Sequence, residues 1–318
     1  MRVSPCFLLL IPIFFLSCFK TKTKDVPPPG QVFTDVLYGT ALTEANKLQP
    51  LGMDIYMPAG NDAGKSYPLF VMIHGGGFKE GDKKEMKSHC SLLAGSGYIA
   101  VSINYRLGWR GSDNKKCEGD TVGEYFALYR AVQDANAALR FLVSKQKEYH
   151  IDTSRIYIGG GSAGSTIAMY THYMPASEAA VLLPVECKQL GKLNEGDNAL
   201  RDTFTIKGIV NLWGGIGDSA LINRSNAVPM ISFHGMSDPL SPYDIGREFS
   251  CAAYPVALGS ACISRQLARY NVPYRLYLKK GAAHAPAAYH APVTIPAAVS
   301  FFDDLRKGEE LKGKVMVE

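Results

Sequence analysis

Several features that mark other classes of protein are missing from this sequence of 318 residues. No run of lysine and arginine is interleaved with aromatic residues, so the net charge of +5 carries no nucleic-acid-binding signature. His172 and His290 have no carboxylate or cysteine at ligand spacing, and we expect neither a metal nor a cofactor. What is present, 47% hydrophobic and 20% charged residues, predicts a globular protein with a sizeable core.

The N-terminal segment predicts export. Its apolar run, residues 7–16, is too short to anchor stably across a bilayer, so residues 1–18 are interpreted as a signal peptide. The segment ends in Phe15-Leu16-Ser17-Cys18, which resembles a bacterial lipobox whose cysteine is lipidated. The polar, proline-containing residues 19–30 then form a tether, and we expect a lipoprotein in the periplasm or at the cell surface. An ordinary cleavable signal and a secreted protein are the alternative.

Strand-like and helix-like segments alternate over residues 31–306. This alternation predicts right-handed crossovers and a mostly parallel sheet in a single domain, with ligands bound beyond the carboxyl ends of its strands. Residues 175–204 lack a clean period and are interpreted as an insertion, and residues 307–318 as a charged tail. We expect two strands in 31–57, then strands at 68–74, 98–104, 155–158, 206–213, 229–234 and 273–278, and helices at 83–96, 123–149, 163–174, 241–271 (mostly helical, with an interruption) and 292–306.

A G-x-S-x-G motif, residues 160–164, joins a buried strand to a helix. The strained turn exposes Ser162, and the positions two before and two after it need glycine because side chains there would meet the neighbouring backbone. The same glycines also fit the G-x-G-x-x-G fingerprint of dinucleotide sites, for which Glu178 lies close to the spacing of the acidic residue. Glu178 follows Met174-Pro175 and has no strand before it, which disfavours that alternative.

Four motifs together resemble the α/β-hydrolase fold, specifically esterases and lipases of the feruloyl-esterase-like and hormone-sensitive-lipase-like groups. The resemblance covers roughly residues 31–306 and implies a serine carboxylesterase. Gly161 stands where the hormone-sensitive-lipase group usually has an acid, which favours the feruloyl-esterase-like side. The motifs, in the family's order, are His74-Gly75-Gly76-Gly77-Phe78, the serine motif, His234-Gly235-Met236-Ser237-Asp238 and Gly281-Ala282-Ala283-His284.

The resemblance assigns a role to each member of a catalytic triad. Ser162 is the nucleophile, His284 the base that takes its proton, and Asp238 the acid that holds the imidazole in the required tautomer. The amides of Gly76, Gly77 and Ala163 would form the oxyanion hole. The alternatives are His290 for the base and Asp218 and Asp244 for the acid.

Further residues are expected around this centre. Trp213 ends a strand on the same rim and is a candidate for the acyl pocket, although a core position would be equally ordinary. Asn104-Tyr105-Arg106 resemble a family sequence that braces the glycine loop, and His74 is expected to be structural.

The substrate is expected to be a short-chain acyl ester, with acetyl or feruloyl groups on carbohydrates as candidates. We also expect the protein to contact the membrane through its lipid anchor.

Two other functions stay open. A peptidase of the prolyl-oligopeptidase type has a similar acid loop, but the chain has no room for its gating domain. A non-catalytic binding protein on a hydrolase scaffold would usually lose a triad member, and all three candidates are present.

Five cysteines lie beyond the export segment: Cys90, Cys117, Cys187, Cys251 and Cys262. Export permits disulfides, and an odd number leaves at least one thiol free. We expect a Cys251–Cys262 bridge across the irregular stretch between them, although Cys117 and Cys187 could equally pair.

The Cys18→Ala variant tests the anchor. We expect it to release the protein from the membrane fraction or to block processing, because the thiol is the lipidation site. Fractionation of cells followed by immunoblotting measures this, and an unchanged distribution would leave a plain secreted protein.

Overall fold

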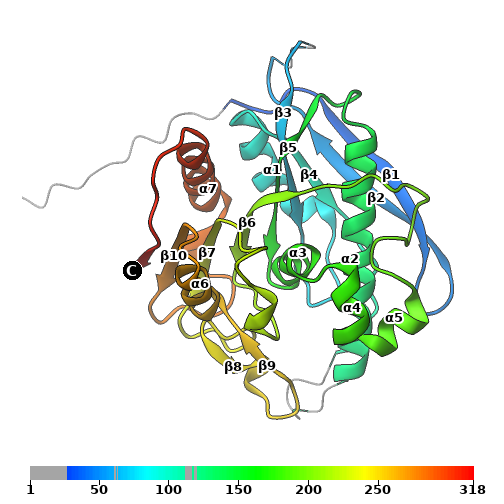
Figure 1. The fold of residues 1–318 in the computed structure, drawn as a ribbon, viewed down its shortest axis with the longest axis vertical. Coiled ribbons are helices and arrows are strands. Elements are labelled where there is room, and N and C mark those ends of the chain that lie inside the picture. The colour runs from blue at the N-terminus through cyan, green and yellow to red at the C-terminus, as the bar shows by residue number, and fades with distance from the viewer. Residues whose placement is uncertain (1–26, 61, 63, 112–116, 118–119) are drawn as a thin grey trace, which may run out of the picture.

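The computed structural model describes residues 27–60, 62, 64–111, 117 and 120–318. Within them, the centre of the molecule is a nine-stranded sheet of order β1-β2-β4-β3-β5-β6-β7-β10-β11 (Figure 1). β1, β2 and β4 pair antiparallel, and the ladders from β4 across to β11 are parallel, which confirms the predicted architecture. The strands are β1 (Val32–Leu42), β2 (Leu48–Tyr56), β3 (Tyr67–Ile73), β4 (Ile99–Ile103), β5 (Ile151–Gly161), β6 (Ile206–Leu212), β7 (Met230–Gly235), β10 (Tyr274–Lys279) and β11 (Lys314–Val317).

Helices cover both faces of the sheet (Figure 1). α1 (Lys87–Gly95) and α7 (Ala291–Arg306) pack on one face, and α2 (Thr121–Ser144), α3 (Ala163–Tyr173) and α6 (Ser260–Arg269) pack on the other. Strands β3 and β4 are accordingly apolar along almost their whole length, as is typical of parallel strands buried on two sides. The remaining helices are α4 (Ala176–Leu182), α5 (Pro184–Leu190) and the 3-10 turns η1 (Lys83–Met86), η2 (Ser219–Leu221), η3 (Glu248–Ser250) and η4 (Ala287–Tyr289).

The predicted helix over residues 241–271 is wrong in its first half. Only α6 is helical there, and the preceding residues form η3 and an antiparallel pair of short strands, β8 (Ile245–Arg247) and β9 (Val256–Leu258). Leu258 also bridges to Ile216, so a partner distant in the sequence stabilises the extended backbone. Pro255, directly before β9, has no N–H to donate to a helix, which removes a helical alternative.

Residues 307–318 were predicted to be a charged tail, but part of this segment belongs to the sheet. Residues 314–317 form β11, which pairs in parallel with β10 and extends the sheet at its edge. Met316 is half-buried and its three neighbours in the strand are exposed, as is typical of an edge strand. The sheet therefore continues past residue 306, where the domain was predicted to end.

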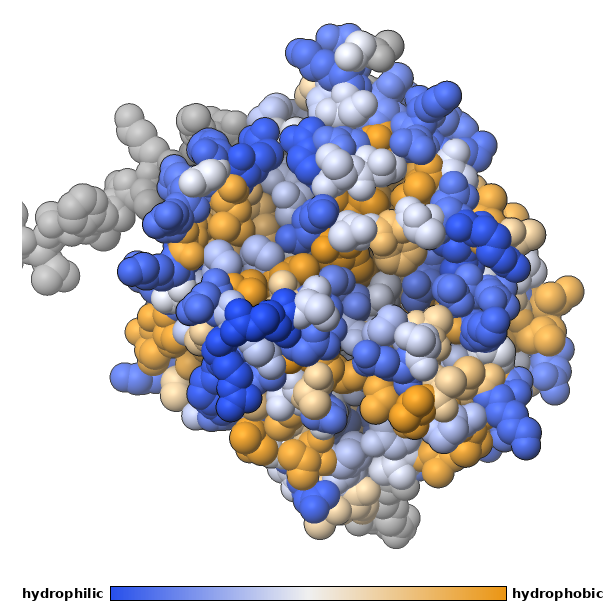
Figure 2. All heavy atoms as spheres, viewed as in Figure 1, coloured by the Kyte–Doolittle hydropathy of each residue, from blue (hydrophilic) through white to orange (hydrophobic). Residues whose placement is uncertain are grey.

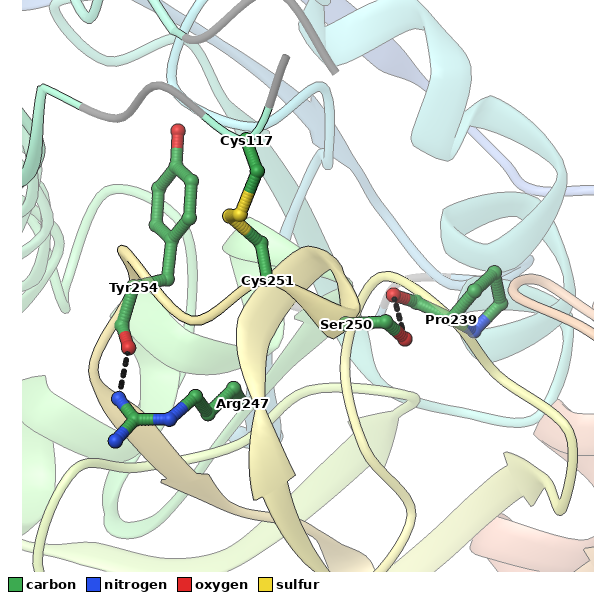
Figure 3. The surroundings of a disulfide bond; sticks show 6 residues. All are labelled: Cys117, Pro239, Arg247, Ser250, Cys251 and Tyr254. Carbon is green, nitrogen blue, oxygen red and sulfur yellow. Dashed lines mark hydrogen bonds between the residues drawn. A yellow bond between two sulfur atoms is a disulfide. The ribbon is translucent and has the colours of Figure 1, made fainter. Parts of the chain in front are cut away.

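The disulfide joins Cys117 to Cys251, and the expected Cys251–Cys262 pair is wrong (Figure 3). The Cα atoms of Cys117 and Cys251 are 5.5 Å apart, although 134 positions separate them in the sequence. Cys262 is a free thiol in the first turns of α6, and the extended strand β9 lies between it and Cys251. The pairing depends on how loops meet, and sequence proximity does not decide it.

No helix in the described ranges is both long and apolar enough to cross a bilayer.

We expect the Cys117→Ser/Cys251→Ser double variant to lose about 2–4 kcal/mol of unfolding free energy, because the bridge restricts the unfolded chain across a long loop. Urea unfolding followed by circular dichroism measures this. Cys262→Ser is the matched control, since it removes a thiol that the structure leaves unbridged. An equal loss in both variants would contradict the Cys117–Cys251 pairing.

Candidate active site

Ser162 lies in the tight turn between β5 and α3. Its φ of 54° is in the left-handed region, which is costly for a residue with a side chain and exposes the hydroxyl above the sheet. The flanking glycines permit this turn, because a Cβ on Gly160 or Gly164 would come within 2.4 Å or 2.1 Å of the Ile73 carbonyl oxygen at the end of β3. The serine motif therefore packs against β3 as the sequence predicted.

His284 and Asp238 complete a continuous hydrogen-bonded chain with Ser162. The Nε2 atom of His284 is 2.8 Å from Ser162 Oγ, and its Nδ1 atom is 2.7 Å from Asp238 Oδ2. Asp238 lies in the loop after β7 and His284 in the loop after β10, so three separate strand ends supply the three groups. The Asp238 side chain is fully buried and that of His284 is 17% exposed. This arrangement allows the imidazole to take a proton from the serine hydroxyl.

Both carboxylate oxygens of Asp238 are fixed. Oδ1 accepts hydrogen bonds from the backbone N–H groups of Leu240 and Ser241, and Oδ2 faces His284 and His234. Burial opposes ionisation, but the hydrogen bonds from His234 and His284 outweigh it and hold the pKa of Asp238 far below its usual range. The carboxylate is therefore ionised at neutral pH, in a position where it could stabilise a positive charge on His284.

His234 supports this carboxylate from the opposite side. Its Nε2 atom lies 3.3 Å from Asp238 Oδ2 and 3.0 Å from the Ser241 carbonyl oxygen, and its Nδ1 atom is 2.7 Å from Ser260 Oγ. Asn211 Nδ2 in turn donates to that serine oxygen. Sequence reasoning used His234 only as part of a motif; its place at the end of buried β7 was the signal for this role.

The backbones of Gly76, Gly77 and Ala163 line the same cavity as Ser162. Gly76 and Gly77 have φ values of 95° and 58°, and Ala163 is the first residue of α3. A Cβ on Gly76 would come within 2.0 Å of the Glu80 carbonyl oxygen, so this turn requires glycine. Over the described residues, no protein acceptor pairs with these three N–H groups. They lie in the cleft beside Ser162, where an oxyanion would need donors.

The BD-FAE family model matches residues 53–221, more than half of the chain.

The chain belongs to the BD-FAE family.

Curated relatives of this BD-FAE chain include several esterases. Esterase LipI of Mycobacterium tuberculosis is 33% identical over 37% of this chain and 33% of its own length. Fumonisin B1 esterase of Sphingopyxis macrogoltabida is 29% identical over 36% of this chain and 21% of its own length. The chain thus matches about a third or less of the length of these relatives.

Solved structures match over almost the whole BD-FAE chain. A truncated carbohydrate esterase from gut microbiota has a TM-score of 0.61 at 15% identity, covering 88% of this chain and 98% of that one. Esterase 2 of Thermogutta terrifontis with bound propionate has a TM-score of 0.58 at 20% identity, covering 90% and 96%. At these identities the likeness shows the fold, and it confirms the predicted α/β-hydrolase fold.

The glycine loop of the BD-FAE chain is braced by two of the three residues expected to do so. Tyr105 Oη donates to the Gly75 carbonyl at 3.0 Å, and its ring stacks on buried His74 at 4.4 Å. Asn104 accepts from the N–H of Lys83 and donates to Asp82. His74 is structural, as predicted, and burial lowers the pKa of its imidazole.

Arg106 does not brace the loop. Its guanidinium pairs with Asp134 and Asp197 and donates to the Leu42 carbonyl, so it fixes α2 and the segment after α5 to the end of β4. The expectation failed because a buried guanidinium needs carboxylate partners, which Asp134 and Asp197 supply.

Trp213 lies at the cleft, with its ring 6.4 Å from that of His284 and beside Gly161.

The alternative site residues lie elsewhere. His290 is exposed and contacts the Ala287 carbonyl, Asp218 caps η2, Asp244 pairs with Arg265, Glu178 is exposed on α4, and His172 contacts the Asn226 carbonyl. In the described ranges, no three His, Cys, Asp or Glu side chains are grouped to hold a metal ion. Cys18 falls outside the described residues.

A cleft of about 490 Å³ opens at Ser162. Its rim includes exposed Leu240 and Val256, and Figure 2 shows hydrophobic residues gathered toward the lower end of the viewed face, where Figure 1 places β8 and β9. Sequence reasoning missed several lining residues because α1, α2 and η3 meet there only through tertiary packing. These are His89, Trp109, Glu124, Tyr125, Glu248 and Phe249.

The Asp238→Asn variant tests the acid. The amide oxygen can keep the turn to Leu240 and Ser241, but the NH₂ group would face His284 Nδ1 and leave the proton on Nε2. We expect the rate of Ser162 phosphonylation by a fluorophosphonate to fall about 10³–10⁴-fold, measured by intact-protein mass spectrometry. Asp244→Asn, an exposed aspartate paired with Arg265, should label at the wild-type rate. Equal rates for both variants would remove Asp238 from the triad.

Proposed function

We propose that this protein is a serine carboxylesterase that hydrolyses short-chain acyl esters, with acetyl or feruloyl groups on carbohydrates as its natural substrates. The observation that carries the proposal is the hydrogen-bonded chain from Asp238 through His284 to Ser162, ending beside three unpaired amides. These are the groups that acyl transfer requires: a nucleophile, a base with an orienting acid, and donors for an oxyanion.

The reaction follows from this geometry. Ser162 Oγ attacks the ester carbonyl carbon as its proton passes to His284 Nε2, and the carbonyl oxygen becomes an oxyanion among the amides of Gly76, Gly77 and Ala163. Collapse breaks the bond to the alcohol, which leaves with the proton from His284. Water then attacks the acyl-serine with His284 again as base, which releases the acid and restores the serine.

The comparisons support an ester rather than another acyl substrate. The curated relatives include esterases of several kinds, and one similar structure is named a carbohydrate esterase. Three successive glycines leave space close to Ser162, and a cleft of about 490 Å³ is within the usual range for a small-molecule site. Both features suit a compact acyl group.

Export is part of the proposal, with Cys18 as the lipid anchor. The Cys117–Cys251 disulfide supports it, because such bonds persist in oxidising compartments. The proposed substrates are polymers and fragments met outside the cytoplasm.

We expect Ser162→Ala to lose fluorophosphonate labelling and esterase activity while keeping the wild-type melting temperature, since the change removes one oxygen atom. The wild-type domain from residue 26 onward is assayed on nitrophenyl esters of increasing acyl length, acetylated xylan, feruloyl esters and a nitroanilide. Acetyl and feruloyl esters should be cleaved fastest.

Three results would contradict the proposal. Labelling that survives Ser162→Ala would identify a different nucleophile. Faster cleavage of the nitroanilide than of every ester would indicate a peptidase, and faster cleavage of long-chain esters would indicate a lipase.

A further inference from the structure

Two glutamates face the substrate cleft beyond the triad. Glu124 lies in the first turn of α2 and Glu248 begins η3, and both line the cavity that contains Ser162. Each is half-buried, and the two carboxyl groups are hydrogen-bonded to each other. The mechanism above uses neither group, and neither has another carboxylate-binding partner such as a salt bridge to arginine or lysine among the described residues.

We propose that Glu124 and Glu248 form a subsite for hydroxyl groups on a substrate ring and thereby select hydroxylated esters. The inference rests on the proposed function and names the part of the substrate that this site recognises. The ring is either the sugar that carries the ester or a phenolic acyl group, and the experiment below separates these two sources.

The distance along the cleft suits a ring next to the scissile bond. Thr166 and Tyr170 follow Ser162 by one and two turns of α3, and both line the cavity. At 1.5 Å per residue, the cleft therefore extends about 6–12 Å along α3 from the nucleophile. Glu248 lies at the Tyr170 end, where its charge acts on the tyrosine hydroxyl. A ring attached to an ester at Ser162 would reach this end.

The charge state of the pair fits hydroxyl recognition. Burial and repulsion between the carboxylates raise the pKa of Glu124 to about 9, with Asp120 adding to the rise and Lys79 opposing it. Burial also raises the pKa of Glu248. A carboxyl pair with raised proton affinity can offer both a donor and acceptors, which a substrate hydroxyl can satisfy in both directions. An alkyl chain would cover these half-buried carboxyl groups without satisfying their remaining donor and acceptor positions, which is unfavourable.

An aromatic wall adjoins the carboxyl pair. The rings of Trp109 and Phe249 line the cleft with centroids 5.6 Å apart, and Tyr254 packs behind them at 4.7 Å from Phe249. Flat apolar surfaces of this kind bind the face of a ring, while the carboxyl groups bind its edge.

A disulfide joins the two segments that carry the glutamates. Cys251, three residues after Glu248, is bridged to Cys117, which precedes the Asp120 cap of α2 and so the turn that carries Glu124 (Figure 3). On the other side, Ser250 Oγ donates to the Pro239 carbonyl at 3.1 Å, next to Asp238 (Figure 3). Glu248 and Asp238 therefore lie on one connected segment of the chain, between β7 and β9.

The test compares esters that differ only in the hydroxylated ring. Monoacetylated xylose is paired with ethyl acetate, and methyl 4-hydroxycinnamate is paired with methyl cinnamate. We expect the wild type to prefer the hydroxylated ester by at least about ten-fold in kcat/KM in one pair, because each hydrogen bond to a charged group contributes to binding. The pair that shows the preference identifies the ring as sugar or phenol.

The Glu124→Gln/Glu248→Gln double variant should lose that preference by about ten-fold or more, because kcat/KM for the hydroxylated ester falls much further than kcat/KM for the unhydroxylated ester. The single variants Glu124→Gln and Glu248→Gln should show a preference between those of the wild type and the double variant. Glu178→Gln, an exposed glutamate on α4 outside the cleft, is the matched control and should keep the wild-type ratio. The melting temperature of each variant shows whether the isosteric amides leave the fold intact.

The outcomes distinguish a failure of the subsite from a failure of the proposed esterase function. A wild type that hydrolyses esters without preferring either hydroxylated member would overturn the subsite and leave the esterase standing. An equal fall on both members of a pair in the double variant would show a structural role and also overturn the subsite. A wild type that cleaves none of the esters would overturn both.

Discussion

The contact between the end of β3 and the β5–α3 turn is the constraint on which the rest of the site depends. Gly160 and Gly164 let the turn approach the Ile73 carbonyl more closely than any side chain would allow. Ser162 is thereby held with a positive φ at the carboxyl edge of the sheet, and the residues that follow Ile73 begin the glycine loop beside it. One packing contact thus places the hydroxyl next to the amides of Gly76 and Gly77.

A second constraint is electrostatic and acts on buried carboxyl groups. Asp238 is stabilised as an anion because two imidazoles and two backbone N–H groups face it. Glu124 and Glu248 are half-buried and face each other, so their proton affinity rises. Carboxyl groups in two parts of the same site therefore differ in proton affinity according to their partners.

Local signals predicted the elements whose conformation depends on neighbours in the sequence. The buried run before Ser162, its glycines and the long apolar period of α2 indicated a strand, a turn and a helix that the structure confirms. β8 and β9 were missed because their extended backbone is stabilised by each other and by Ile216. β11 was missed because four residues in a charged segment form a strand only where β10 offers an unpaired edge.

The sequence by itself determined the fold class and the position of the serine turn, and it predicted His284 and Asp238 because each follows a recognisable strand within a short motif. Only the tertiary structure decided that Cys117 pairs with Cys251, that Arg106 turns to Asp134 and Asp197, and that Glu124 meets Glu248. These contacts join segments that lie from 28 to 134 positions apart and carry no shared local pattern. Their partners are chosen by how helices and loops pack on the sheet, which no single stretch of sequence encodes.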